Sequence, residues 1–149
     1  MPTSTRFAVA VHILAGLATF GEEPLNSEAI AKSANTNAVV IRRILSMLNE
    51  AGFTRAQLGQ GGGALLAKPA AEITLLDVYR AVEREGLFAL HRSKPNGDCM
   101  VGRNIQLVLE TTLHKARTQM EAELAKVSIA DIARDIAKRG RRGTGARTP

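Results

Sequence analysis

The sequence predicts a mostly α-helical chain that carries one small β-hairpin. Apolar residues recur at helical spacing over most of the chain, and the hydrophobic content of 45% is that of a globular protein. Aromatic residues are few, with four Phe, one Tyr and no Trp, so the core must consist mainly of Leu, Ile, Val and Ala. The helical pattern is interrupted once, by the stretch GQGGG at 59–63. A chain of 149 residues is long enough for one domain with its own core.

Three helices are expected before the glycine-rich stretch. They cover residues 6–20, 27–35 and 38–52 in chain order. Asn26 or Ser27 is expected to cap the second helix, and Asn37 the third. One apolar stripe on the third helix faces the core and comprises Ile41, Ile44, Leu45 and Leu48. Arg42 and Arg43 lie away from the centre of this stripe.

Short apolar segments on both sides of the glycines predict a hairpin rather than a flexible linker. Residues 53–58 and 64–67 can form two strands, with 59–63 as the turn between them. Two helices joined by a short turn and followed by a glycine-tipped hairpin, or wing, make a winged helix-turn-helix. In that arrangement the second helix of the pair enters the DNA major groove, and the wing backbone can run beside phosphates.

The winged helix-turn-helix arrangement predicts which residues contact DNA. Arg42 and Arg43 can pair with guanine edges or bind phosphate, whereas the Asn37 side chain either contacts phosphate or serves only as a helix cap. Glycine at the tip of the wing permits close approach of the backbone to another group. The candidate set is Ser27, Asn37, Arg42, Arg43, Arg55, Gln60, Gly61, Gly62 and Lys68.

Two segments carry a family resemblance. TNAVVIRRILSMLNEAGF (36–53) and GQGGGALLAKPAAEITLLDVYRAVE (59–83) resemble the Rrf-two family of bacterial winged-helix transcription regulators. The resemblance extends over about residues 3–135 and implies a homodimeric, double-stranded DNA-binding regulator, more often a repressor. It also implies a DNA-backbone contact at Arg6. Many members have Arg where this chain has Leu58, so Arg55 or Gln60 is expected to supply the wing's phosphate contact.

The second half of the chain predicts an assembly element. A helix capped by Thr74, an irregular loop over 84–98, a long helix from about Gly102 to Val127 and a last helix capped by Ser128 are expected in this order. A continuous apolar seam runs along the long helix and comprises Ile105, Leu109, Leu113, Ala116, Met120, Leu124 and Val127. A small domain does not need so long a helix for its own core, so a second copy of the chain is expected to cover the seam.

The only cysteine, Cys99, lies just before the long helix. The resemblance places it at the family's signal position, where cluster-binding members carry three cysteines. One thiolate with His91 and Asp98 nearby is a poor donor set, so no metal, iron–sulfur cluster or other cofactor is expected. Two alternatives remain: an oxidant or thiol sensor, whose thiolate the helix N-terminus and Arg103 would favour, or an inert packed thiol.

If Cys99 is inert, the regulator would instead bind a small metabolite between the long helix and the DNA-binding domain. A third possibility is a winged helix that binds only protein. An enzyme is not expected, because the three histidines are scattered and no nucleophile–base motif occurs.

The net charge of +6 is concentrated at the end of the chain. Residues 138–149 contain five basic and no acidic residues, which leaves 15 basic against 14 acidic residues in 1–137. The expected organisation is a DNA-binding domain at 1–84, a signal loop with the long and last helices at 85–138, and a disordered basic tail at 139–149. No apolar run is long enough to span a membrane, and cytoplasmic residence is expected.

Overall fold

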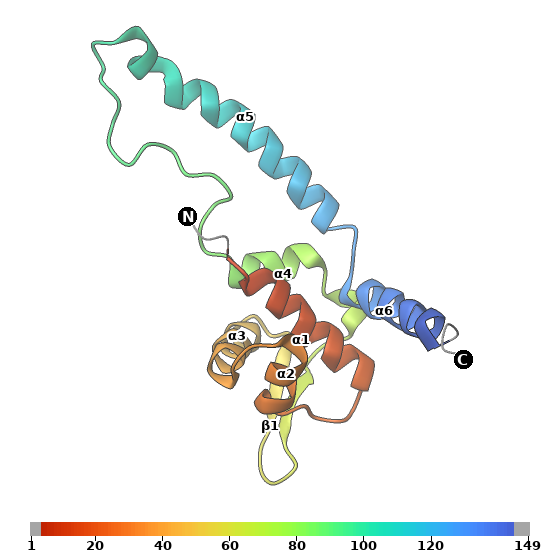
Figure 1. Cartoon of the computed structure of the whole chain (residues 1–149). Helices are drawn as coiled ribbons and strands as arrows, with labels where there is room; N and C mark the ends of the chain where they lie inside the picture. Colours follow the sequence, from red (N-terminus) through yellow and green to blue (C-terminus); the bar gives the residue numbers. More distant parts are fainter. Residues whose placement is uncertain (1–3, 145–149) are drawn as a thin grey trace.

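The computed structural model describes residues 4–144 and is mostly helical (Figure 1). Its elements are α1 (Arg6–Phe20), α2 (Ser27–Ala34), α3 (Ala38–Glu50), β1 (Thr54–Gln57), β2 (Gly63–Leu66), the short 3-10 helix η1 (Ala70–Glu72), α4 (Leu75–Val82), α5 (Met100–Leu124) and α6 (Ile129–Thr144). The predicted fold class, three helices followed by a hairpin and later a long helix, is confirmed.

The core lies around α1, which contacts α2, α3, α4, α6 and β2. We call this part, α1 to α4 with the wing and the start of α6, the head. Its fully buried side chains come from α1, α3, α4 and α6 and from Ile73, the residue that follows η1. They include Ile13, Leu14, Leu17, Ile41, Ile44, Leu48, Ile73, Val78, Val82 and Ile129. All are aliphatic, as the low aromatic content predicted. The inward face of α3 is therefore fixed, and its opposite face is turned to solvent.

Asparagine side chains set the geometry of the helix-turn-helix. Asn26 Oδ1 accepts from the Ala29 amide at 2.8 Å and caps α2, and Asn37 Oδ1 accepts from the Val40 amide at 3.0 Å and caps α3. Between the two helices Asn35 has φ of 52°, a left-handed conformation that asparagine tolerates better than most residues. These local interactions end α2 and start α3 within a three-residue turn.

The wing is an antiparallel hairpin that is also tied to the helices. Thr54 pairs with Leu66 at its base, and Gln57 pairs with Gly63 near its tip. Leu25, in the α1–α2 connection, exchanges backbone hydrogen bonds with Ala64 at 3.1 and 2.8 Å. The wing therefore has a fixed position beside α2 and does not behave as a separate flexible loop.

The second half of the chain leaves the head and returns to it. α5 extends away from the head, whereas α6 packs along α1 (Figure 1). Residues 84–98 form the expected irregular loop. Among residues 4–144, no helix is both long and apolar enough to cross a membrane.

The ends of α5 and α6 differ from the prediction. α5 runs from Met100 to Leu124, so Val127 lies beyond the helix, where its carbonyl accepts from the Leu75 amide at 2.9 Å. α6 continues to Thr144, so residues 139–144 are helical where a disordered tail was expected. Arg and Lys are good helix formers, and their charge is favourable at a helix C-terminus, which explains the extension. Residues 145–149 of that tail lie outside the described part of the chain.

Candidate nucleic-acid interface

The outer face of α3 presents the candidate base-reading residues. Val39, Arg42, Arg43 and Ser46 are all exposed and follow i, i+3, i+4, i+7 spacing, so they lie on one face of the helix. Val39 is 58% exposed although it is apolar. An exposed aliphatic group one turn before two arginines suits contact with a thymine methyl, and arginine suits guanine O6 and N7.

Arg42 forms an exposed ion pair within the helix-turn-helix. Its Nη1 lies 3.3 Å from Glu28 Oε1, and the two side chains are 55% and 72% exposed. A pair this exposed contributes only about 0–1 kcal/mol, so the Arg42 guanidinium can leave Glu28 for a base or phosphate at little cost. Competition from Glu28 for Arg42 was not predicted from the sequence.

Ser27 and Arg55 meet at a hollow between the helix-turn-helix and the wing. This wing hollow has a volume of about 200 Å³, and its lining includes Ser27, Asn49, Arg55 and Gln57. Ser27 is the first residue of α2, so two predicted contacts from separate elements lie on one surface. Asn49 and Gln57 were missed. For Asn49 the available signal was its position next to the buried Leu48, at the edge of the apolar stripe of α3; β1 shows no alternation that would have indicated Gln57.

Close backbone contacts and a positive φ within the chain favour glycine at the tip of the wing. A Cβ on Gly62 would lie 2.1 Å from the Gln57 carbonyl oxygen, and one on Gly63 would lie 2.5 Å from the backbone of Leu25. Gly61 has φ of 76°, which other residues rarely adopt. Gln60 is exposed at the tip, and the neighbouring Leu58 is 90% exposed. Turn geometry and close backbone packing therefore account for these glycines without a ligand.

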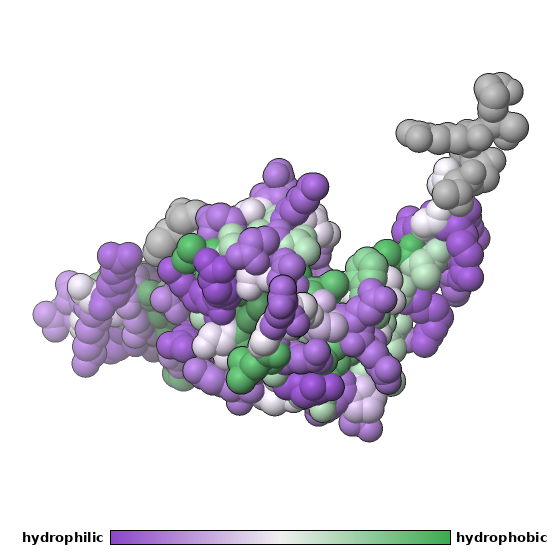
Figure 2. All heavy atoms as spheres, turned by 90° about the horizontal axis from the view of Figure 1, so that it is seen from below, coloured by the Kyte–Doolittle hydropathy of each residue, from purple (hydrophilic) through white to green (hydrophobic). Residues whose placement is uncertain are grey.

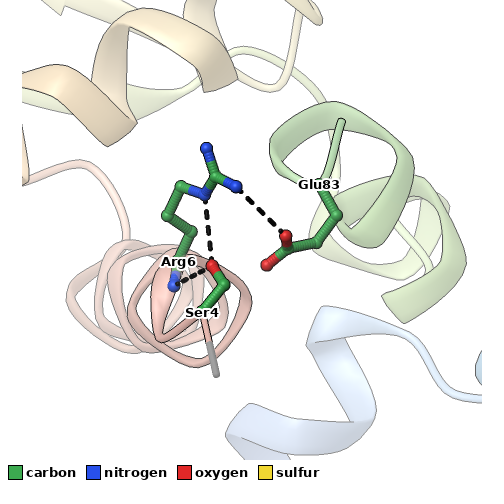
Figure 3. A network of polar contacts seen from close by, with 3 residues as sticks. All are labelled: Ser4, Arg6 and Glu83. Atoms are coloured by element: carbon green, nitrogen blue, oxygen red, sulfur yellow. Dashed lines mark hydrogen bonds and ion pairs between the residues drawn. The ribbon is translucent and has the colours of Figure 1, made fainter. Parts of the chain in front are cut away.

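Two further candidate cations are engaged within the chain. Lys68 Nζ lies 5.7 Å from the centroid of the Phe53 ring, a cation–π contact. Arg6 Nη2 lies 3.4 Å from Glu83 Oε2, and Arg6 Nε donates to Ser4 Oγ at 3.1 Å (Figure 3). Arg6 thus links the start of α1 to the end of α4.

Asn37 is a helix cap, which was one of its two predicted roles. The capping oxygen already accepts from Val40, so a phosphate contact would use the side-chain amide nitrogen.

Cys99 is exposed and occupies the N-cap position of α5. The nearby backbone amides of Gly102 and Val101 lower the pKa of its thiol because they favour the thiolate, although the side chain makes no capping hydrogen bond. The predicted help from Arg103 is not what lowers this pKa: the Arg103 guanidinium donates to the Gly97 carbonyl at 3.1 Å instead. These amides belong to the first turn of α5, where helix amides have no partner within the helix.

Two surface hollows can be compared with the predicted metabolite site. One is the wing hollow, and a second of about 210 Å³ lies between α1 and α2, lined by His12, Phe20, Leu25 and Ser33 among others. Neither is lined by α5, where a metabolite was expected to bind.

The fold and the exposed α3 face define a winged helix-turn-helix protein of the transcription-regulator class. The Rrf2 family, described as iron-dependent transcriptional regulators, matches residues 3–135, and the chain belongs to this family. It is 44% identical over 130 residues to the Bacillus subtilis (strain 168) protein named "Putative HTH-type transcriptional regulator YwnA", covering 87% of this chain and 95% of that protein. The resemblance stated from the sequence is confirmed.

Solved structures agree with the fold. A crystal structure described as that of "a putative DNA binding protein" has 40% identity and a TM-score of 0.67, covering 85% of this chain and 97% of that one. CymR (YrzC), the global cysteine regulator of B. subtilis, has a TM-score of 0.66 at 21% identity, covering 89% of this chain and 96% of CymR. At that identity the likeness to CymR supports the fold alone.

The donor set of this chain does not fit the iron dependence in the family description. The sequence has one cysteine, and among residues 4–144 no three His, Cys, Asp or Glu side chains are grouped to hold a metal ion. An iron–sulfur cluster is usually held by four thiolates or equivalent ligands.

Proposed function

We propose that this protein is a cytoplasmic, homodimeric repressor that binds operator DNA through α3 and the wing, and that Cys99 senses oxidants. Support for the DNA interface comes from the exposed α3 face, where Arg42 and Arg43 stand opposite the buried Ile41–Leu48 stripe. Repression needs no further activity, because a dimer that covers two half-sites can block access of polymerase to the same DNA.

The observation that carries the dimer is the uncovered α5. None of its 25 residues is buried, and the seam residue Leu109 is 37% exposed. The seam from Ile105 to Leu124 runs along the same helix. Apolar surface of this extent on one helix is typical of an interface, and a second α5 has the matching seam.

Sedimentation tests this dimer. We expect wild-type protein to sediment as a dimer at micromolar concentration. Leu113→Asp should shift it to monomer, because the seam would bury an unpaired carboxylate. Thr118→Asp is the matched control, because Thr118 is exposed on the polar side of α5. A wild-type monomer, or dissociation by both variants alike, contradicts the proposed seam.

The proposed signal is oxidation of the Cys99 thiolate by a peroxide. The thiolate sulfur attacks one peroxide oxygen, the O–O bond breaks, and sulfenic acid and hydroxide result. The new group would stand at the first turn of α5, among the Val101 and Gly102 amides. A change there would alter how the loop 84–98 joins α5, and through it the spacing of two heads in a dimer.

Operator binding before and after peroxide tests the sensor. Oxidised wild type should bind more weakly, and dithiothreitol should restore binding. Cys99→Ser should bind as reduced wild type does and should not respond to peroxide. If mass spectrometry shows full oxidation of Cys99 while binding stays unchanged, the sensor proposal is wrong and the DNA interface is unaffected.

A further inference from the structure

The last part of α6 carries basic residues that the operator interface does not use. Lys138, Arg139 and Arg142 lie in its final turns, and no acidic residue follows Asp135. We call these three residues the basic end of α6. All three lie on α6, which the structure describes as far as Thr144.

The two halves of α6 have different surroundings. Ile129 is fully buried in the head, and Asp131 pairs with Arg134 at 2.9 Å, so the first half is anchored and carries no excess of positive charge. From Arg134 to Gly143 every residue is exposed. The basic end therefore stands on a helix extension that contributes little to the core of the head.

The direction of this extension is defined by the fold. α5 leaves the head on one side and α6 ends on the other (Figure 1). The view from below, the side toward which the wing points, shows the end of α6 standing clear of the head with hydrophilic residues along it (Figure 2). In a dimer joined through α5 the partner lies on the α5 side, so the basic ends of the two copies face outward.

We propose that the basic end of α6 binds phosphates of the DNA that flanks the operator. This inference rests on the proposed function, because the operator positions the head on the duplex. Arginine and lysine bind phosphates without reading sequence, and each contact releases condensed counterions. The contact would extend each half-site outward and would add affinity without adding base specificity.

Anionic membrane is the other polyanion that a basic amphipathic helix can bind. Such a helix inserts its apolar face between lipids. Here Ile129 at the start of that face is buried in the head and Ile132 beside it is half-buried, so Ile136, 51% exposed, is the large apolar side chain of α6 that remains open to a lipid surface. Phosphates of DNA need only the basic side, so DNA is the favoured partner.

Salt-dependent binding to two duplexes tests the proposal. Wild type first selects an operator from a random-sequence pool; one duplex then contains the operator alone, and the other adds about 10 bp, one helical turn, on each side. The variant is Lys138→Gln/Arg139→Gln/Arg142→Gln, since glutamine keeps helix propensity while it removes charge. The control is Arg84→Gln/Arg92→Gln/Lys94→Gln, which removes the same charge from the exposed loop beside α5.

On the flanked duplex, the slope of log K against log salt should be shallower for the variant by about 0.9 for each phosphate that it no longer neutralises, with affinity reduced on the order of tenfold. On the operator alone, variant and wild type should bind equally, and the control should match wild type on both. Circular dichroism should show unchanged helix content.

Equal slopes for variant and wild type on the flanked duplex would overturn the proposal and leave the proposed function standing. Equal loss on both duplexes would also overturn it, because the residues would then act on the operator contact or the fold. Binding to phosphatidylserine vesicles that the variant loses, with DNA binding unchanged, would assign the basic end to membrane. If wild type selects no sequence, the proposed function itself fails.

Discussion

At the scale of single residues, Arg42 and Arg43 are the candidates for sequence reading. Replacing both by Ala should lower operator affinity by about 1–3 kcal/mol for each base that the protein no longer binds, and should relax sequence preference. Arg84→Ala with Arg92→Ala removes the same charge from an exposed loop and should change affinity little. Fluorescence anisotropy on operator and scrambled duplexes measures both effects. Unchanged preference in the Arg42/Arg43 variant would remove α3 as the reading helix.

Glu28, the ion-pair partner of Arg42, affects the same contact with DNA. It holds Arg42 in an exposed ion pair and would carry its negative charge close to the bound duplex. Glu28→Gln should therefore raise DNA affinity several-fold, with the gain largest at low salt because exposed charges are screened. Weaker binding by this variant, measured at the same salt concentrations, would show that Glu28 positions Arg42 for DNA and does not compete for it.

Gly62 is constrained by the chain itself. A Cβ at this position would approach the Gln57 carbonyl oxygen to 2.1 Å, so Gly62→Ala must displace the wing backbone and should cost about 1–3 kcal/mol of unfolding free energy. Gly97→Ala is the control, because a Cβ at Gly97 meets no atom within 4 Å. Urea denaturation compares the two. Equal midpoints would mean that the wing tip is not packed as described.

At the scale of elements, the start of α6 has a capping box whose strength depends on pH. Ser128 Oγ accepts from the Asp131 amide at 3.1 Å, and Asp131 Oδ2 accepts from the Ser128 amide at 2.9 Å. Hydrogen bonds from the Ser128 backbone and side chain, together with Arg134, lower the pKa of Asp131. A lowered pKa in the folded state means that the carboxylate stabilises the fold above its unfolded pKa, and that this stability is lost as pH falls through the folded pKa.

The pH dependence of unfolding tests this cap. Asp131→Asn should be less stable than wild type near neutral pH, and the difference should shrink as the solution is acidified. Asp135→Asn is a control on the same helix. A difference that is constant from neutral to acid pH would show that the Asp131 carboxylate does not cap α6.

Helix starts were the most predictable features of the elements. Asn26, Asn37, Thr74 and Ser128 each cap a helix, because these side chains satisfy free amides through local contacts that sequence spacing reveals. The end of α6 was not predictable in the same way. Glycines at 140 and 143 indicated disorder, whereas the helix continues through both.

The candidate site was only partly predictable. The outward position of Arg42 and Arg43 follows from helical periodicity, and that of Val39 and Ser46 follows from it equally, although neither was among the predicted contacts. The contacts of Arg6 with Glu83 and of Lys68 with Phe53 join residues from different elements. Such contacts depend on tertiary packing, and no local spacing in the sequence indicates them.

At the scale of the whole molecule, operator binding by a dimer requires two heads held at a fixed spacing by α5. The most direct test is to sequence the DNA that wild-type protein selects from fragments of its own genome. A two-fold dimer predicts inverted repeats whose halves are centred about 10–10.5 bp apart, or a multiple of this spacing. Enrichment of single unpaired half-sites, or of no sequence at all, would contradict a dimeric operator-binding regulator.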